Sequence, residues 1–277
     1  MYSLNMAKGT TKKTKQVAIS DTELLRLHRF NRWFAVIYTV EGVIFFLFAA
    51  AYSVPVIINY LAVNPINSAV VGHTVLSAAT RPLFNISIPG LITILFLVSA
   101  LVHGLLATVY RKRYEAELAL NVNTVRWLEY AIASGLMLVL IGLLSGVYDF
   151  GTLIAIFGFM VVMCLLGLVT ELTSRGSQPN WPAYWGSAVA GFIPWLVIGF
   201  CIFNSSYYGS AHIPGYIYGI YGTMFVCIVG FAMNMYLHYK KRGKWAKYAY
   251  AERCFMLLSL VTKSVLAWQI FAGILRP

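Results

Sequence analysis

Charged residues are scarce in this chain. Of its 277 residues only 11% are Asp, Glu, Lys or Arg, and 60% are hydrophobic. A soluble domain carries about 25% charged residues, so the composition excludes an ordinary soluble protein and indicates one that crosses a membrane several times. Between Gly176 and Tyr239 there is no Asp, Glu, Lys or Arg at all. That stretch can contribute shape and apolar surface to a site, but no charge.

Cysteine is rare as well. The four cysteines, Cys164, Cys201, Cys227 and Cys254, form no CxxC motif and show no paired spacing, which argues against a disulfide framework or a metal site. We expect them to pack as small apolar residues. No nucleophile–base pair is apparent either, so the sequence does not indicate an enzyme. Residues 1–32 are polar and basic without an apolar core, so no cleavable signal peptide is expected.

Seven apolar runs follow one another along the chain, each of about 20 residues, the length that crosses a bilayer. We expect these spans at 33–54, 89–110, 128–147, 151–171, 183–203, 215–238 and 254–274. The predicted fold is an all-α membrane protein, a bundle of seven transmembrane helices. The connection at about 55–88 is long and contains short β-type runs, which indicates an ordered loop such as a hairpin or a dimer contact.

Lys and Arg are distributed unevenly over the connections between these runs. Eighteen of the 21 basic residues fall in the N-terminal segment or in the second-to-third, fourth-to-fifth and sixth-to-seventh connections. The positive-inside rule then places the N-terminus in the cytoplasm and the C-terminus outside the cell membrane. The net charge of +12 is a topology signal that also attracts the anionic lipids of the bilayer, and no nucleic-acid partner is expected.

Lys263 is the only charged residue between Cys254 and Leu275. An ammonium group near the centre of a bilayer is energetically costly, so it must be paired, neutralised or chemically modified. Proteins use such a lysine as a proton-coupled transport site or as the amine that forms a Schiff base with a carbonyl ligand. Ser259 lies one helical turn earlier on the same face, where it can hydrogen-bond the imine or its counter-ion.

A protonated Schiff base inside a membrane needs a carboxylate counter-ion. Seven of the nine acidic residues are expected on the cytoplasmic side, in an outer turn or at a helix end: Asp21, Glu23, Glu115, Glu117, Asp149, Glu171 and Glu252. Glu41 and Glu129 are left. Residue counting places Glu129 about 9 Å short of Lys263 in depth, although a lysine side chain leans toward the N-terminus of its helix and reduces the mismatch. Alternatively, Glu129 is an interfacial partner of Arg126.

One histidine and three tryptophans can each be interpreted in two ways. His103 in the second span is either a satisfied polar residue between helices or a proton carrier. Trp185, Trp195 and Trp268 either pack as interface aromatics or form the walls of a flat ligand pocket.

Several segments resemble the heliorhodopsins, a microbial rhodopsin family of inverted topology. They are Phe30-Asn-Arg, Ser99-Ala-Leu-Val-His, Arg126-Trp-Leu-Glu-Tyr, Ile193-Pro-Trp, Gly243-Lys-Trp and the stretch around Lys263 from Ser259 to Phe271. The resemblance covers 29–277 in order, and its cytoplasmic N-terminus agrees with the charge distribution. It implies a basic cytoplasmic tail, 1–28, followed by a seven-helix retinal-binding domain, 29–277.

The resemblance implies all-trans retinal bound covalently to Lys263 as a protonated Schiff base, with Glu129 as its counter-ion. It also implies a set of further residues around the chromophore or in a cytoplasmic cavity: Ser259, Ser134, His103, Arg126, Trp185, Pro194, Trp195 and Ile228. The implied function is a light sensor, a homodimer with a slow photocycle and little or no ion transport, which acts on its cytoplasmic surface or on a partner there.

Tyr38 and Glu41 depart from the family pattern, which has a histidine and a glutamine at these positions of the first span. The change removes one proton acceptor and adds an ionisable acid. Light-driven or light-gated proton movement through Tyr38, Glu41 and Arg126 is therefore an alternative function. A transporter that uses Lys263 as a proton site without a chromophore is a third.

Overall fold

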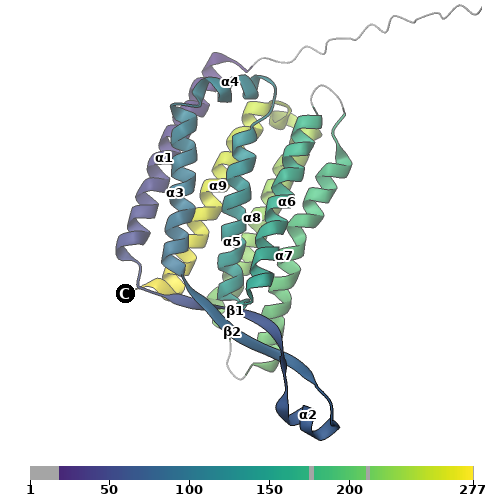
Figure 1. The fold of residues 1–277 in the computed structure, drawn as a ribbon. Helices are drawn as coiled ribbons and strands as arrows, with labels where there is room; N and C mark the ends of the chain where they lie inside the picture. The colour runs from purple at the N-terminus through teal and green to yellow at the C-terminus, as the bar shows by residue number, and fades with distance from the viewer. Residues whose placement is uncertain (1–18, 175–177, 210–212, 277) are drawn as a thin grey trace, which may run out of the picture.

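The computed structural model describes residues 19–174, 178–209 and 213–276. Within these ranges seven helices are long and apolar enough to cross a membrane, and they stand side by side in one bundle (Figure 1). The helices are α1 (Asp21–Phe48), α3 (Ile88–Ala107), α5 (Thr124–Leu144), α6 (Phe150–Thr173), α7 (Trp181–Tyr208), α8 (Gly215–Tyr239) and α9 (Tyr248–Ile270). The prediction of seven spans is confirmed.

Neighbouring helices pack in a continuous series. Helix α1 contacts α3 and α9, α3 contacts α5, α5 contacts α6, α6 contacts α7, and α8 contacts α9. Helix α5 is the most enclosed, with 67% of its most apolar window buried inside the bundle. Side chains on α5 are therefore shielded from lipid on most sides, and a charged group there needs a partner from a neighbouring helix.

Helix α1 begins and ends earlier than the predicted span 33–54. Ser20 caps its N-terminus by accepting a hydrogen bond from the amide of Glu23, as N-cap serines do. The helix ends because Ala49 adopts an extended conformation that leads into a strand. The boundary expected after residue 28, between tail and helical domain, falls inside this helix, and most of the expected tail lies outside the described residues.

The connection between α1 and α3 forms a β-hairpin that projects beyond the bundle (Figure 1). Strands β1 (Ser53–Val63) and β2 (Leu76–Ser87) pair antiparallel over their whole length. A short helix, α2 (Pro65–Val71), closes the tip. It ends at Gly72 with a φ of 73°, a left-handed conformation that favours glycine. The long loop expected at 55–88 is therefore an ordered hairpin.

Asp149, the residue before α6, fastens the hairpin to the bundle. Its carboxylate caps α6 by accepting a hydrogen bond from the Thr152 amide at 2.8 Å, and it accepts another from Asn59 Nδ2 of β1 at 2.8 Å. The Ile57 amide donates to the Tyr148 carbonyl at 2.9 Å. The hydrogen bond from the Thr152 amide has the largest effect on Asp149 and holds its pKa below the ordinary value. The capping carboxylate is therefore charged at neutral pH.

Helix α4 (Arg111–Ala119) covers the opposite end of the bundle (Figure 1). Glu115 Oε1 lies 2.6 Å from His28 Nε2 of α1 and accepts a hydrogen bond from Arg111 at 3.0 Å. These contacts lower the pKa of Glu115, and the contact with His28 has the largest effect. Glu117 accepts a hydrogen bond from the Thr124 amide at the start of α5, at 2.9 Å. Helix α4 thus ties α1 to α5.

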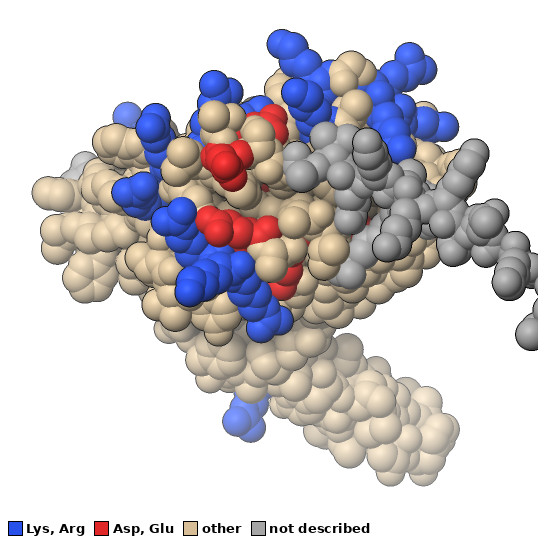
Figure 2. Space-filling model, turned by 90° about the horizontal axis from the view of Figure 1, so that it is seen from above, with Lys and Arg blue, Asp and Glu red and all other residues tan. Residues whose placement is uncertain are grey.

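Basic side chains gather at the α4 end of the molecule. Figure 2, seen from that end, shows Lys and Arg around this face, with Asp and Glu nearer its middle. They come from the first turns of α1, from α4, and from the segment between α8 and α9 that contains the 3-10 helix η1 (Gly243–Ala246). This one-sided distribution matches the positive-inside pattern of membrane proteins.

We expect Asp149→Ala to lower the free energy of unfolding by about 1 kcal/mol, because it removes the N-cap of α6, and to loosen the hairpin as well. Asn59→Ala is the matched control, since it breaks the contact to the hairpin but leaves the cap. Denaturant unfolding in detergent, followed by circular dichroism, measures both variants. Equal losses in the two variants would contradict a capping role for Asp149.

Candidate functional site

Lys263 of α9 and Glu129 of α5 form an ion pair in the middle of the bundle. Lys263 Nζ lies 2.5 Å from Glu129 Oε1, and each side chain is 2% exposed. The depth mismatch that residue counting gave for the two residues is absent from the structure, because Arg126 itself lies below the interface. Residue counting treated Arg126 as interfacial, whereas the structure buries it to 4% exposure. Helix α5 therefore enters the bundle earlier than its sequence suggested.

Hydroxyl groups complete the hydrogen bonding of this pair. Lys263 Nζ donates to Ser259 Oγ at 2.8 Å, and Ser99 Oγ of α3 donates to Glu129 Oε1 at 2.6 Å. The Tyr38 hydroxyl donates to Ser259 at 3.5 Å, and the Tyr38 ring lies 5.0 Å from Lys263 Nζ. The predicted partner Ser259 is thus in place. Such additional hydrogen bonds reduce the cost of burying an ion pair.

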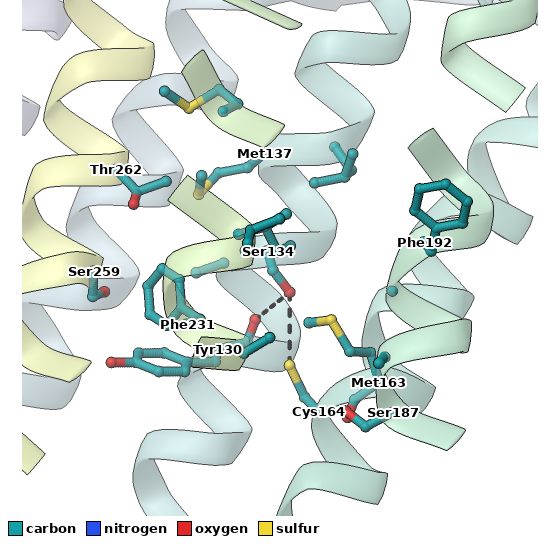
Figure 3. Close-up of a pocket in the computed structure, with 18 of the residues that line it drawn as sticks. Tyr130, Ser134, Met137, Met163, Cys164, Ser187, Phe192, Phe231, Ser259 and Thr262 are labelled. Carbon is teal, nitrogen blue, oxygen red and sulfur yellow. Dashed lines mark hydrogen bonds between the residues drawn. The ribbon is translucent and has the colours of Figure 1, made fainter. Parts of the chain in front are cut away.

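A cavity of about 240 Å³ opens beside Lys263, between α5, α6, α7, α8 and α9. Figure 3 shows aromatic, methionine and small hydroxyl side chains around it. The residues that form its walls are mostly apolar and include Tyr130, Met137, Leu138, Met163, Trp195, Met224, Phe225, Ile228 and Phe231. Ser134 lies 3.7 Å from Cys164 on one side. The cavity therefore offers an apolar interior with a lysine in its wall.

Two polar atoms in the cavity wall have no hydrogen-bond partner within the described chain. They are Trp195 Nε1 and Thr262 Oγ1, and both are buried. Buried polar atoms are normally satisfied, so these two positions point to an occupant of the cavity. Both atoms lie on helices that carry other predicted site residues, α7 and α9.

The sequence predictions for the cavity wall are partly correct. Ser134, Trp195 and Ile228 line the cavity together with Ser259 and Lys263.

Trp185 does not form part of the cavity wall, contrary to the prediction. Its side chain is 57% exposed on the outer surface of α7, whereas the preceding residue, Tyr184, lines the cavity. One residue corresponds to about 100° of helix rotation, which turns Trp185 toward lipid. Pro194 is buried but lies outside the cavity wall, to which α7 contributes Gly191 and Trp195 instead.

His103 lies on the far side of the ion pair from the cavity. Its Nδ1 lies 2.7 Å from Asn31 Oδ1, and its ring stacks on Tyr38 with centroids 5.5 Å apart. It borders a small hollow that also touches Glu129 and Arg126. His103 is therefore absent from the wall of the large cavity, and the interpretation as a hydrogen-bonded residue between helices fits the structure.

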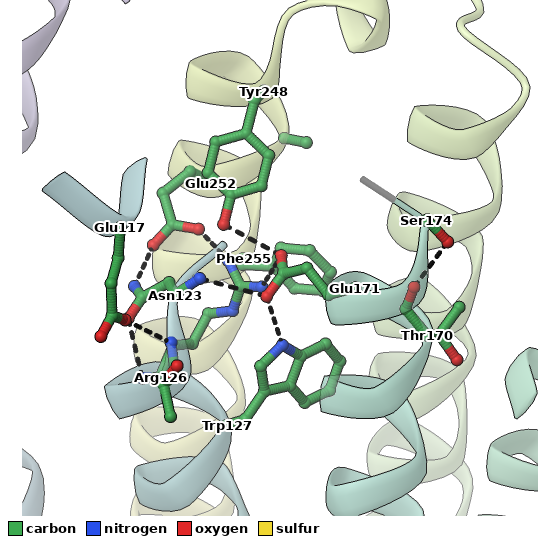
Figure 4. A network of polar contacts seen from close by, with 12 residues as sticks. Glu117, Asn123, Arg126, Trp127, Thr170, Glu171, Ser174, Tyr248, Glu252 and Phe255 are labelled. Atoms are coloured by element: carbon green, nitrogen blue, oxygen red, sulfur yellow. Dashed lines mark hydrogen bonds and ion pairs between the residues drawn. The ribbon is translucent and has the colours of Figure 1, made fainter. Parts of the chain in front are cut away.

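A second buried charge cluster surrounds Arg126, one turn before Glu129 on α5 (Figure 4). The Arg126 guanidinium forms ion pairs with Glu171 of α6, at 2.7 Å, and with Glu252 of α9. Glu171 also accepts hydrogen bonds from Trp127 Nε1 at 2.7 Å and from the Tyr248 hydroxyl at 2.9 Å. Arg126 is therefore not the partner of Glu129, contrary to one of the alternatives.

Sequence reasoning missed Glu171 and Glu252 as members of this cluster. Glu171 lies near the end of α6 and Glu252 near the start of α9, as expected from the sequence, but the burial of both side chains was not expected. Asn123, which donates to Glu252 at 2.6 Å, was missed as well. A buried arginine needs carboxylate partners. That requirement is the sequence signal that could have pointed to Glu171 and Glu252.

Glu41 of α1 lies apart from both clusters and is absent from the cavity wall. It accepts hydrogen bonds from Ser264 Oγ at 3.0 Å and from Trp268 Nε1 at 3.4 Å, both on α9. Trp268, for which a pocket wall was one interpretation, packs on Phe45 instead.

Comparison with known proteins identifies the family. The sequence model of the family described as Heliorhodopsin matches residues 27–275. The chain belongs to the heliorhodopsin family. Among solved structures, that of a light-driven proton pump, LR (Mac), from Leptosphaeria maculans is similar, with a TM-score of 0.56 and 14% identity over 92% of this chain and 96% of that chain. At this identity the likeness shows the fold alone. No curated protein sequence matches significantly.

This heliorhodopsin is an integral membrane protein with a seven-helix, microbial-rhodopsin-like fold, and membership of the family implies a retinal chromophore. The cavity fits that group. Its walls are apolar and aromatic, they include a buried lysine, and two of the wall residues, Trp195 and Thr262, have buried polar atoms without a hydrogen-bond partner.

Gly167 of α6 allows the Trp127 ring to approach the helix backbone closely. A Cβ atom at Gly167 would collide with that ring, whereas one at Gly158 on the same helix would meet nothing within 4 Å. We expect Gly167→Ala to displace Trp127 from Glu171 and to lower the free energy of unfolding by about 1–3 kcal/mol. Gly158→Ala is the matched control. Thermal unfolding in detergent should separate the variants, and equal midpoints would contradict the role of this contact.

Proposed function

We propose that this heliorhodopsin is a light sensor that binds all-trans retinal covalently through Lys263. The observation that carries the proposal is that Lys263, paired with Glu129, lines an apolar cavity. The amine is the nucleophile that a retinal aldehyde requires, and the cavity accepts a long apolar chain. Bound retinal supplies visible-light absorption and a light-driven change of shape.

Each neighbouring side chain has a defined task in this proposal. Glu129 compensates the positive charge on the Lys263 nitrogen after the bond has formed, as a buried cation requires. Ser99 and Ser259 fix the positions of the carboxylate and the nitrogen by hydrogen bonds. The aromatic walls exclude water, which strengthens the electrostatic attraction inside the site.

A route from this site to the α4 end runs along α5. Arg126 lies one turn from Glu129, and its ion pairs join α5 to α6 and α9. A change in the Lys263–Glu129 pair therefore acts on a helix whose charged contacts lie close to the basic surface. We place this surface in the cytoplasm, and we include a slow photocycle, a homodimer and a cytoplasmic signalling partner in the proposal.

We expect all-trans retinal added to the purified protein to produce a visible absorption band. Lys263→Ala should abolish the band, because no amine is left to form the imine. Glu129→Gln should shift the band to longer wavelength, because the counter-ion charge is lost. Trp185→Phe is the control on the lipid side of α7 and should leave the band in place, whereas Trp195→Phe in the cavity wall should shift it. A wild-type protein without a band, or a Lys263→Ala protein with one, would refute retinal binding through Lys263.

Light-driven or light-gated proton movement is the second candidate function. It is favoured by Glu41, a buried acid on α1 one helical turn after Tyr38, whose ring contacts Lys263. In illuminated lipid vesicles a transporter would change the internal pH, and a protonophore would abolish the change and Glu41→Gln would weaken it. We expect no such pH change from a sensor, and a pH electrode or a trapped dye distinguishes the two functions.

A further inference from the structure

Glu41 differs from the other membrane-buried acids in having no cationic partner. Glu129 pairs with Lys263, and Glu171 and Glu252 pair with Arg126. Glu41 is only 9% exposed. Within the described part of the chain, no ion pair includes it. An ionised carboxylate in a bilayer without a cation is costly, so burial favours the neutral, protonated form of Glu41.

The two hydrogen-bond partners of Glu41 fix the position of that proton. An indole N–H can only donate, so Glu41 Oε1, which faces Trp268 Nε1, must be an acceptor in either protonation state. A serine hydroxyl can donate or accept. The proton of the neutral acid therefore belongs on Oε2, which lies 3.0 Å from Ser264 Oγ.

The same partners also satisfy the ionised acid. When Glu41 is protonated, its Oε2–H donates to Ser264, whose hydroxyl can donate to a helix carbonyl one turn earlier. When Glu41 loses the proton, the Ser264 hydroxyl rotates and donates to the carboxylate, while the Trp268 N–H bond persists. Both states keep two hydrogen bonds, so the group can gain and lose a proton without rearranging the helices.

Glu41 is connected to the ion pair through its immediate neighbours on α1 and α9. Ser264 is the residue after Lys263, and Tyr38, one turn before Glu41 on α1, places its ring 5.0 Å from Lys263 Nζ. Helix α1 packs on α3 and α9. The titratable side chains around Tyr38 and Lys263 are His103 of α3 and Glu129 of α5.

We propose that Glu41, Ser264 and Trp268 form a proton-binding site, separate from the Lys263–Glu129 pair, that holds one proton on Oε2 of Glu41 in the dark. Release breaks the O–H bond and transfers the proton to water, and it leaves a carboxylate that accepts hydrogen bonds from Ser264 and Trp268. The release adds one negative charge to the surroundings of Lys263.

Infrared spectroscopy of the full-length protein in lipid vesicles, without retinal, tests this site directly. We expect the wild-type spectrum to contain the carbonyl band of a protonated carboxylic acid that is missing from Glu41→Gln. The difference between the two spectra is decisive, because Glu171 and Glu252 share one arginine and can contribute a band of their own. The control Glu115→Gln, outside the bundle, should leave this band unchanged. A wild-type spectrum identical to that of Glu41→Gln in this region overturns the proposal.

Two further variants test the placement of the proton. Ser264→Ala removes the acceptor of the O–H group, and Trp268→Phe removes the donor to the carbonyl oxygen. Each should weaken one hydrogen bond to the acid and shift its carbonyl band to higher frequency. A band that does not move in Ser264→Ala overturns the assignment to Oε2.

A second measurement rests on the proposed function, since it requires bound retinal. Raising the pH should ionise Glu41 and shift the visible band of the wild-type protein to shorter wavelength, because the new negative charge stabilises the positive charge at Lys263. Glu41→Gln should lack that shift, and a shift of equal size in both proteins overturns the proposal. Failure to form any visible band contradicts retinal binding alone, because the infrared result does not depend on the chromophore.

Discussion

A charge inside a membrane must have a partner, and the interior of this bundle is arranged around that constraint. Lys263 meets Glu129, and Arg126 meets Glu171 and Glu252. These pairs come from three helices, α5, α6 and α9, and breaking any of them would leave an uncompensated charge, a loss of about 3–5 kcal/mol. They therefore set the relative depth of the three helices more strictly than apolar packing could, because apolar side chains tolerate sliding.

The two charge clusters differ in what surrounds them. The Lys263–Glu129 pair borders a cavity with apolar walls, whereas the Arg126 cluster is enclosed by the donors Trp127, Tyr248 and Asn123. A group at the edge of a cavity can react with a ligand. A group saturated with hydrogen bonds holds helices together. Glu129, which belongs to the reactive pair, and Arg126, which holds helices together, thus lie within one or two helical turns of each other on α5.

Sequence alone predicted the features that depend on one-dimensional patterns. The seven spans follow from apolar runs, and Lys263 and Glu129 stand out because charge is scarce in their surroundings. Trp185 was misplaced because a lipid-facing tryptophan and a cavity-facing tryptophan have the same sequence signature, and only the phase of α7 separates them. The pairing of Glu252 was missed because its partner, Arg126, lies 126 residues away, and no local pattern reports such a contact. The departure at Glu41 was visible, but its hydrogen-bond partners were not.

The two ends of the bundle differ in how freely their connections could be altered. Helix α4 is a strut, because its acids hold both α1 and α5. The tip of the hairpin is held only by its own strands, and no residue of α2 is buried. Exposed tips of this kind accept inserted sequences. A fluorescent reporter or an affinity tag would therefore sit at Asn67 without disturbing the helices, and it would report from the side of the membrane opposite to the basic surface.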